Sequence, residues 1–335
     1  MTTVRWGVVG TANIARRLFL PAVRQAGGEV SAVAGRDAAR TAQWAHDNGI
    51  GRAVTGYAGL IGDPEVDALY IPLPNTLHGQ WTISALRAGQ PVLCEKPLTG
   101  SLAQTEQVLA VARETGTPLW EAFVFPFQDQ MERIRGLLDD GVIGELREIQ
   151  SGFHFLLTRR EGNIRMSADM AGGALLDVGC YPVRLAREAF GAEHTSAWAT
   201  ADWDAGGVDL ATWGSLGFPD GRRLLLSCGF NRATDTFSRL LGTTGQINIT
   251  NPFHPTAQDR FEVCVEGREP ITHPGAGPGQ QPFTAAIRHI QAVVRGEEEP
   301  RLLAVDTSLG SARALHDLAA SATAQRAGQQ AGQQA

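Results

Sequence analysis

The chain has 335 residues, of which 43% are hydrophobic and 19% charged, a balance that supplies ample material for a folded core. This length exceeds what one compact domain usually needs and suits two. The formal net charge of −6, without any basic run, argues against nucleic acid as a partner, because phosphate binding needs clustered Lys and Arg. No apolar stretch is long enough to cross a bilayer, so we expect no membrane partner either.

The N-terminus and the cysteines indicate a cytoplasmic protein. The stretch "MTTVRWGVVG" lacks the basic start, apolar middle and small-residue cleavage site of a signal peptide. Cys94, Cys180, Cys228 and Cys264 are widely spaced, with no CxxC pair and no histidine at ligand spacing. We therefore expect reduced thiols, no disulfide framework and no metal site.

Over its first 120 residues the chain alternates short apolar runs with helical patterns. The apolar runs lie at residues 4–10, 29–35, 66–73, 91–95 and 118–123. The helical patterns lie at residues 13–26, 37–48, 76–89 and 102–115. This alternation predicts βαβ units, and hence an N-terminal α/β domain over residues 1–122 with a doubly wound parallel sheet of the Rossmann type. Pro21 lies inside the first helical pattern and should kink or divide that helix.

After about residue 125 the rhythm changes to strand-like runs joined by turns. A helical pattern at 128–140 comes first, and two more at 283–295 and 307–324 close the chain. The strand-like runs lie at residues 146–157, 195–203, 208–218, 222–230, 238–249 and 260–267. We predict an α+β domain over residues 123–325 with a large, mostly antiparallel sheet, whose last helix can pack back on the first domain. The small, polar tail at 326–335 should be disordered.

The stretch "GVVGTANIA", residues 7–15, joins the first strand to the first helix. A dinucleotide fold needs a tight turn there, a close approach of the backbone to the pyrophosphate, and a helix N-terminus aimed at it. Gly10 supplies the turn, while Ala12 and Ala15 take the other two small positions of the motif. A mere packing turn would look similar, but the βαβ context favours a cofactor site. Its predicted contacts are Gly10, Thr11, Ala12, Asn13 and Ile14.

The end of the second strand favours NADP(H) over NAD(H). An acidic residue at this place bonds the ribose 2′-hydroxyl of NAD, whereas arginine suits the 2′-phosphate of NADP. Here Gly35 leaves room, Arg36 follows, and Arg40 comes one helical turn later. Asp37 is the acidic residue that could instead bond the ribose 2′-hydroxyl of NAD, but its position fits a helix N-cap better. The alternative is that both arginines are ordinary surface residues.

Charged residues end the strand at 91–95, where ligands sit in a doubly wound sheet. A partly desolvated Lys96 there can hydrogen-bond a substrate oxygen and neutralise developing negative charge. Glu95 would hold the lysine or contact the nicotinamide ribose, and Pro97 would fix the backbone. In "LLDVGCYPVR" Asp177 and Tyr181 are four residues apart, on one face if the segment is helical. The alternatives are a solvent-facing Glu–Lys pair, a core tyrosine, and an aspartate that caps a helix or joins an ion pair.

Taken together, these motifs resemble the Gfo/Idh/MocA oxidoreductases over roughly residues 3–325. The resemblance lies in the order and spacing of "GVVGTANIA", "IPLPNTLH" (71–78), "EKP" (95–97), "GVIGELREI" (141–149) and "AGGALLDVGCYP" (171–182). Within the family, residues 163–184 look most like nucleotide-sugar 3-ketoreductases. The motif at 171–182 also resembles the dihydrodiol and xylose dehydrogenases.

The resemblance implies an NADP(H)-dependent oxidoreductase that moves hydride between nicotinamide and a secondary alcohol or ketone of a sugar, sugar derivative or polyol. Tyr181, where many members carry histidine, would pass the proton to or from the substrate oxygen. A phenol of pKa about 10 is a poor base unaided, so Lys96 should lower that pKa. Asp177 would orient the substrate or the lysine.

The family also implies further contacts and an assembly. Additional cofactor contacts would be Leu73, Pro74, Asn75, His78, Glu121, Ala122 and Arg165, with substrate as the alternative partner of Arg165. The C-terminal sheet would form a homodimer or homotetramer. Alternation puts Phe153 and Phe155 on one side of their strand and His154 on the other, with the inward side left open.

Three other functions stay open beside this one. The first is a trans-dihydrodiol or xylose-type dehydrogenase. The second is a regulator of the same fold that binds dinucleotide without turnover, against which the presence of Lys96, Asp177 and Tyr181 argues. The third is an enzyme that retains and recycles its cofactor; the chain lacks the N-terminal arm that helps such enzymes.

Overall fold

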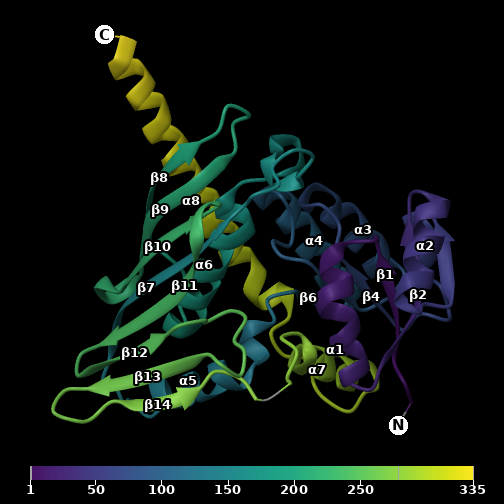
Figure 1. Ribbon diagram of the computed structural model, residues 1–335, viewed down its shortest axis with the longest axis horizontal. Coiled ribbons are helices and arrows are strands. Elements are labelled where there is room, and N and C mark those ends of the chain that lie inside the picture. The colour runs from purple at the N-terminus through teal and green to yellow at the C-terminus, as the bar shows by residue number, and fades with distance from the viewer. Residues whose placement is uncertain (1, 278, 335) are drawn as a thin grey trace. The chain divides into compact units, whose positions relative to one another are not determined.

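The computed structural model describes residues 2–277 and 279–334, with the backbone alone over 329–334. The chain divides into two compact units (Figure 1): Met1–Val124 with Gln281–Leu309, and Phe125–Gln280 with Gly310–Ala335. This division differs from the expected boundary at 122/123 mainly because residues 281–309 group with the first unit. There Phe283 meets Tyr70 edge-on, and Thr284 donates a hydrogen bond to Gln25.

The first unit contains a six-stranded parallel sheet in the order β3-β2-β1-β4-β5-β6. Its strands are β1 (Arg5–Val9), β2 (Glu29–Gly35), β3 (Arg52–Thr55), β4 (Ala68–Ile71), β5 (Val92–Cys94) and β6 (Leu119–Glu121). The predicted Rossmann-type sheet is confirmed. Only the edge strand β3 was missed, because its four residues alternate between half-buried and exposed and carry no apolar run.

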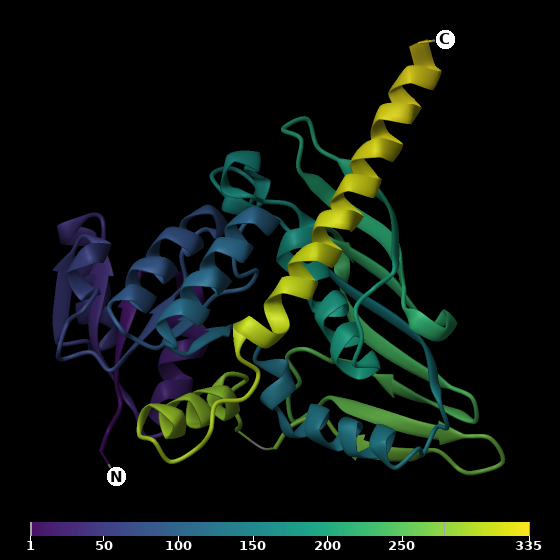
Figure 2. The same cartoon turned by 180° about the vertical axis from the view of Figure 1, so that it is seen from behind.

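Helices cover both faces of this sheet (Figure 2). They are α1 (Leu20–Gln25), α2 (Ala38–Asn48), α3 (Asn75–Arg87), α4 (Leu102–Thr115) and α7 (Thr284–Val294). On one face Phe19 stacks on Tyr70, and on the other side chains of β4 pack with those of α3 and α4. The first helix is divided as Pro21 predicted: a π-helical turn, Ala15–Phe19, precedes α1, where the proline occupies the first turn.

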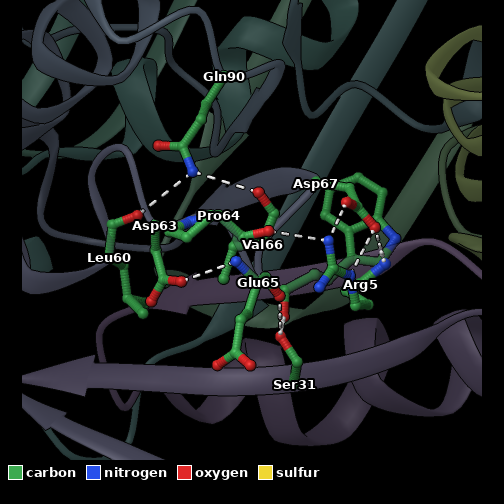
Figure 3. Close-up of polar contacts among 10 residues, drawn as sticks. Arg5, Ser31, Leu60, Asp63, Pro64, Glu65, Val66, Asp67 and Gln90 are labelled. Atoms are coloured by element: carbon green, nitrogen blue, oxygen red, sulfur yellow. Dashed lines mark hydrogen bonds and ion pairs between the residues drawn. The ribbon is translucent and has the colours of Figure 1, made fainter.

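The amino end of this sheet is tied together by polar contacts (Figure 3). Asp67 accepts hydrogen bonds from the Arg5 backbone N–H at 2.8 Å and from its guanidinium at 2.7 Å. Gln90 donates to the carbonyls of Leu60 and Val66. It also accepts from the backbone N–H of Gly62. These contacts satisfy the groups of the loop that leads into β4, so this end of the sheet is structural.

The second unit contains an eight-stranded sheet in the order β14-β13-β12-β11-β7-β10-β9-β8. Its strands are β7 (Leu146–Leu156), β8 (Ser196–Trp203), β9 (Asp209–Gly217), β10 (Arg223–Gly229), β11 (Asn231–Gly242), β12 (Gly245–Ile249), β13 (Arg260–Val265) and β14 (Ile271–Pro274). Among the described residues, β7 and β10 pair in parallel, and the other neighbouring strands of this sheet pair antiparallel. The predicted α+β architecture with a mostly antiparallel sheet is therefore confirmed.

One face of this sheet carries helices (Figures 1 and 2). They are α5 (Asp129–Asp139), a π-helical turn (Leu175–Gly179) that leads into α6 (Cys180–Phe190), and the later part of α8 (Ala304–Gln334). Phe153 points to the helical face, where it meets Tyr181, whereas His154 bonds Ser227 on the opposite face. That opposite face exposes Trp198, Trp213 and Leu225, each at least 38% exposed.

The C-terminal segment differs from the expected disordered tail. Helix α8 runs through Gln334, since alanine and glutamine are good helix formers, and residue 335 lies outside the described residues. In the described part of the chain, no helix combines the length and apolar character needed to span a membrane. The four cysteines are free thiols, and burial raises the pKa of Cys94 and of Cys228 well above the usual range.

Candidate active site

The glycine turn after β1 has the geometry that a pyrophosphate needs. Gly10 has φ +118°, a region that other residues rarely adopt, and a Cβ there would lie 2.9 Å from Leu73 Cδ2. Its N–H donates to Ala34 O at 2.8 Å, which joins the turn to β2. The following helix starts at Asn13, so its first N–H groups, which have no partner within the helix, border the turn.

The end of β2 brings Gly35, Arg36 and Arg40 together, as predicted. Side-chain Asp37 accepts a hydrogen bond from Arg40 N at 2.8 Å, so its expected role as N-cap of α2 is confirmed. A Cβ on Gly35 would collide with Thr41 Oγ1, so the space beside this glycine is occupied by Thr41 and was wrongly expected to make room for a phosphate. Both arginine side chains are exposed where α2 begins. The charge, the shape and the occupied aspartate fit a 2′-phosphate better than a free 2′-hydroxyl.

His78 corrects one prediction. Its side chain is fully buried, and its ring nitrogens meet two carbonyl oxygens, Pro97 O at 2.9 Å from Nδ1 and Leu73 O at 2.7 Å from Nε2. Burial lowers the pKa of His78, against the opposing effect of these two acceptors. A direct cofactor contact from this ring does not fit its position. Since a neutral ring carries one N–H, His78 donates to one of these two carbonyls, in the loop after β4 or in the loop after β5.

The loop after β5 holds the predicted Glu95, Lys96 and Pro97. The Glu95 side chain is 6% exposed, and its Oε1 accepts from the Tyr70 hydroxyl at 2.6 Å, while Oε2 accepts from Lys96 N at 3.3 Å. The Lys96 side chain is half-buried, and its bond to Pro97 is cis. The Glu95 carboxylate is thus held by Tyr70 of β4, and it accepts in turn from the backbone N–H of Lys96.

The end of β6 supports the same loop. The Glu121 carboxylate accepts from Leu98 N at 2.7 Å, and Ala122 N donates to Cys94 O at 2.8 Å. Both residues are buried. Ala122 thus bonds the last residue of β5, and Glu121 bonds the loop that follows β5, in which Lys96 lies. Leu73 is likewise buried, while Pro74 and Asn75 are partly exposed at the start of α3.

In the second unit, the helix that carries Asp177 and Tyr181 starts at a buried carboxylate. Asp209 of β9 accepts from Leu175 N at 2.7 Å and from Thr212 Oγ1 at 2.8 Å. Burial raises the pKa of Asp209 to about 6. A Cβ on Gly173, whose φ is +106°, would collide with Asp209 Oδ1. The glycine pair in "AGGALLD" therefore allows the carboxylate to reach the helix end.

The segment is helical at both predicted positions, as their spacing required. Asp177 lies in the π-helical turn and accepts from Arg165 Nε at 2.6 Å. Asp177 and Arg165, which were predicted as separate site residues, therefore form an ion pair. An ion pair was one of the alternative roles expected for Asp177. Because π-turns occur often at functional sites, this geometry also agrees with a role in the site.

Tyr181 lies in an aromatic cluster within the second unit. Its side chain is 6% exposed and packs against Phe125, Phe153 and Phe253, at centroid distances of 6.3, 5.3 and 5.1 Å. Its hydroxyl lies 3.5 Å from His254 Nε2. The three phenylalanines surround the ring of Tyr181, and its hydroxyl lies beside His254.

The sequence analysis did not identify three residues that contact the predicted site residues. Tyr70 was part of an apolar run, Asp209 lay at the start of a strand, and His254 stood in the loop "NPFHP". A tyrosine inside a fully buried strand weakly indicates a nearby polar residue, because its buried hydroxyl needs a hydrogen-bond partner. Among the described residues, no three His, Cys, Asp or Glu side chains gather as a metal site would require.

Comparison with protein families gives two matches. Residues 4–123 match the model "Oxidoreductase family, NAD-binding Rossmann fold", and residues 131–248 match the model "GFO/IDH/MocA C-terminal domain". Together these matches cover more than half of the chain. The first match contains all six strands of the parallel sheet, and the second contains the other sheet from β7 into β12.

Individual proteins give the same result. A dTDP-3,4-didehydro-2,6-dideoxy-alpha-D-glucose 3-reductase of Streptomyces violaceoruber is 39% identical over 295 residues, which are 87% of this chain and 85% of that protein. The D-xylose 1-dehydrogenase (NADP(+)) 2 of Haloferax volcanii is 35% identical over 265 residues, 78% and 81% of the two chains. The crystal structure of KijD10, a 3-ketoreductase of Actinomadura kijaniata in complex with NADP and TDP-benzene, has a TM-score of 0.85 and 33% identity, and covers 96% of this chain and 98% of its own.

Proposed function

The chain belongs to the Gfo/Idh/MocA family of oxidoreductases, and from that premise we propose that it is an NADP(H)-dependent ketoreductase of nucleotide-linked sugars. The observation that carries this proposal is the 39% identity to a dTDP-keto-sugar 3-reductase over 87% of the chain. The chain also has a lysine directly after β5, Lys96, and a tyrosine at the start of α6, Tyr181. A lysine and a tyrosine are the groups that a carbonyl reduction needs for charge and for the proton.

NADP(H) would be held by the turn at residues 10–14 and by the end of β2. The N–H groups at the start of the first helix would bind the pyrophosphate, and Arg36 with Arg40 would bind the 2′-phosphate. The NADP-bound relative KijD10 and the NADP-dependent xylose dehydrogenase support this choice. Leu73, Pro74 and Asn75 would border the ribose of the nicotinamide.

When bound, this cofactor supplies or accepts the hydride. The protein's residues supply the rest of the chemistry. Lys96 would hydrogen-bond the substrate oxygen and stabilise the negative charge that develops there. Tyr181 would give its phenolic proton to that oxygen in reduction and take it back in oxidation. Asp177 and Arg165 would orient the substrate as a pair, and Glu95 would keep the Lys96 backbone in place.

The substrate class is supported by the relatives. The Streptomyces relative is named for a dTDP-linked keto-sugar, and KijD10 was crystallised with TDP-benzene. The exposed Arg159 and Arg160, which follow β7, suit a diphosphate. A sugar dehydrogenase is the second candidate, which the xylose dehydrogenase supports.

We also propose that the protein is a homodimer or homotetramer through the second sheet. Exposed tryptophans on the face opposite the helices support this, because a monomer rarely exposes several large apolar side chains on one sheet face. Light scattering that returned the mass of a single chain would contradict the proposal.

The function can be tested by absorbance at the reduced-nicotinamide band. Purified protein would be offered dTDP-linked keto-sugars with NADPH, and free sugars or trans-dihydrodiols with NADP⁺. Oxidation of NADPH with the keto-sugars, and a lower KM for NADPH than for NADH, are expected. Turnover of xylose alone would support the second candidate instead. Equal KM values for the two cofactors would contradict the role of Arg36.

The partnership of Lys96 and Tyr181 needs a test of its own. Lys96→Met, Tyr181→Phe and the double variant would be compared in kcat. If the two residues act in one step, the double variant should lose little more than the worse single variant. Losses that multiply would show that the residues act independently.

A further inference from the structure

The hydroxyl of Tyr181 meets the ring of His254, a residue that none of the motifs contains. Tyr181 Oη and His254 Nε2 are 3.5 Å apart, and the two rings lie edge to face with centroids 5.4 Å apart. Phe153 borders both rings, at 5.3 and 6.1 Å. Within this aromatic cluster, His254 therefore places a titratable nitrogen at the polar end of Tyr181.

The loop that carries His254 is held in place by its own hydrogen bonds. Asn251 Oδ1 accepts from His254 N at 3.2 Å, and Asn251 Nδ2 donates to His254 O at 2.8 Å. Asp259 accepts from Asn251 Nδ2 and from the N–H and hydroxyl of Thr256. Gln130 of α5 donates to Asn251 O at 3.0 Å. The backbone on both sides of His254 is thus fixed, and the ring position follows from the fold.

We propose that His254 is a positioning residue that orients the Tyr181 hydroxyl and exchanges a proton with it. This inference rests on the proposed function, because it assigns the source of the proton that Tyr181 delivers. Imidazole is the side chain whose charge changes near neutral pH, and His254 is partly exposed, so water can reach it. A phenol without such a neighbour would have to recover its proton directly from solvent, inside an aromatic cluster.

The proton account balances in both directions. In reduction the substrate carbon gains a hydride, and its oxygen gains the phenolic proton of Tyr181. The resulting phenolate takes a proton from protonated His254 Nε2, and the imidazole then takes one from water. In oxidation each transfer runs backwards, and one proton is released to solvent through His254. No other oxidant or reductant is needed.

Two titratable groups lie next to His254 or next to its loop. Tyr181 of α6 meets the imidazole directly, and Asp259 of the same loop is connected to His254 through Asn251. Phe153 of β7 and Tyr181 both present their rings to the imidazole. A pH effect that depends on His254 should therefore change when Tyr181 is altered.

The first test uses kinetics with three variants. His254→Phe keeps an aromatic ring and removes both nitrogens, His254→Gln keeps hydrogen-bonding capacity, and His273→Gln, which alters a ring stacked on Phe261, is the matched control. We expect both His254 variants to lose about 10- to 100-fold in kcat with KM little changed, and to shift the pH profile of kcat. The control should keep both. A His254→Phe enzyme with the wild-type kcat and pH profile would overturn the proposal.

The second test does not depend on turnover. The side-chain NMR signals of histidine would be titrated in the protein without cofactor, in wild type and in Tyr181→Phe. The midpoint for His254 should move when the hydroxyl is removed, whereas that for His273 should not. An unchanged His254 midpoint would overturn the pairing. If wild-type protein turned over none of the substrates, the proposed function would fail, and this titration would still decide whether the pair exists.

Discussion

The two ends of the parallel sheet in the first unit carry similar charged residues and use them differently. At the amino end Arg5 and Asp67, 62 positions apart, join through hydrogen bonds from both the backbone and the guanidinium. At the carboxyl end Glu95 and Lys96 are adjacent in the chain, yet the Glu95 carboxylate accepts from the Tyr70 hydroxyl. The carboxylate at each end of the sheet thus meets a residue from a distant part of the chain, Arg5 for Asp67 and Tyr70 for Glu95, and the end of the sheet on which a charged residue stands is a guide to its function.

The largest effect is expected from removing a cation at the carboxyl end of the parallel sheet, compared with removing one at its amino end. Lys96→Met should lower kcat by about 100-fold or more, because it removes the cation that stabilises the substrate oxygen, with NADPH affinity little changed. Arg5→Met, the matched control, should keep kcat and lower the midpoint of thermal unfolding. Steady-state kinetics, fluorescence titration with NADPH and calorimetry measure the three quantities. Near-normal turnover of the Lys96 variant would remove lysine from the mechanism.

A second comparison concerns glycines with positive φ. Gly10→Ala should weaken NADPH binding by about tenfold or more, since the strained turn costs about 1–3 kcal/mol and the new Cβ meets Leu73. Gly89→Ala, at φ +74° in a turn with open space around it, controls for strain alone. It should lower stability and leave the dissociation constant of NADPH unchanged. Equal loss of affinity in both variants would show that the turn after β1 has no special role.

The third prediction concerns pH and His78. Its pKa is lowered in the folded protein from the usual 6.5, so the stability that the neutral ring contributes is present above that value and is lost as pH falls through the folded pKa. Urea unfolding from pH 7 towards pH 4 should show a smaller loss of stability in His78→Gln than in wild type. That variant should also cost about 1–3 kcal/mol at pH 7, because one buried carbonyl loses its partner. Parallel curves for the two proteins would contradict the assignment.

The smallest effect is expected at the amino end. Arg5 lowers the pKa of Asp67 from the usual 3.8, so this contribution is present above that value and is lost only as pH falls through the lower folded pKa. Asp67→Asn should cost about 1 kcal/mol at pH 7, because the pair is partly exposed to solvent. Its curve from pH 7 to pH 5 should run parallel to that of wild type. A change in kcat would show that this end of the sheet is not purely structural.

Local patterns allowed much of the fold to be predicted. The helix at 102–115 is observed with the same bounds, Leu102–Thr115, and ends at Gly116 in the left-handed conformation. The cap at Asp37 and the division of the first helix at Pro21 also follow from nearest neighbours along the chain. Such features depend on a few consecutive residues, so the sequence contains all of their causes.

The roles of His78 and Glu121 could not be predicted in the same way. Both stand in motifs, yet each contacts a backbone group of the loop after β5: His78 meets Pro97 O, 19 positions away, and Glu121 accepts from Leu98 N, 23 positions away. A motif shows that a residue belongs to a site. It does not show whether the side chain faces the ligand or the loop that holds the ligand, because that depends on how the strands lie side by side.

The sequence by itself determined most of the strands and helices, the glycine turn, and the helical segment that carries Asp177 and Tyr181, because each depends on short-range pattern. Only the tertiary structure decided that Tyr70 holds Glu95, that Asp209 meets the start of the Asp177 helix, and that His254 faces Tyr181. Those pairs are 25, 34 and 73 positions apart. Packing of whole elements sets such contacts, and no local propensity encodes them.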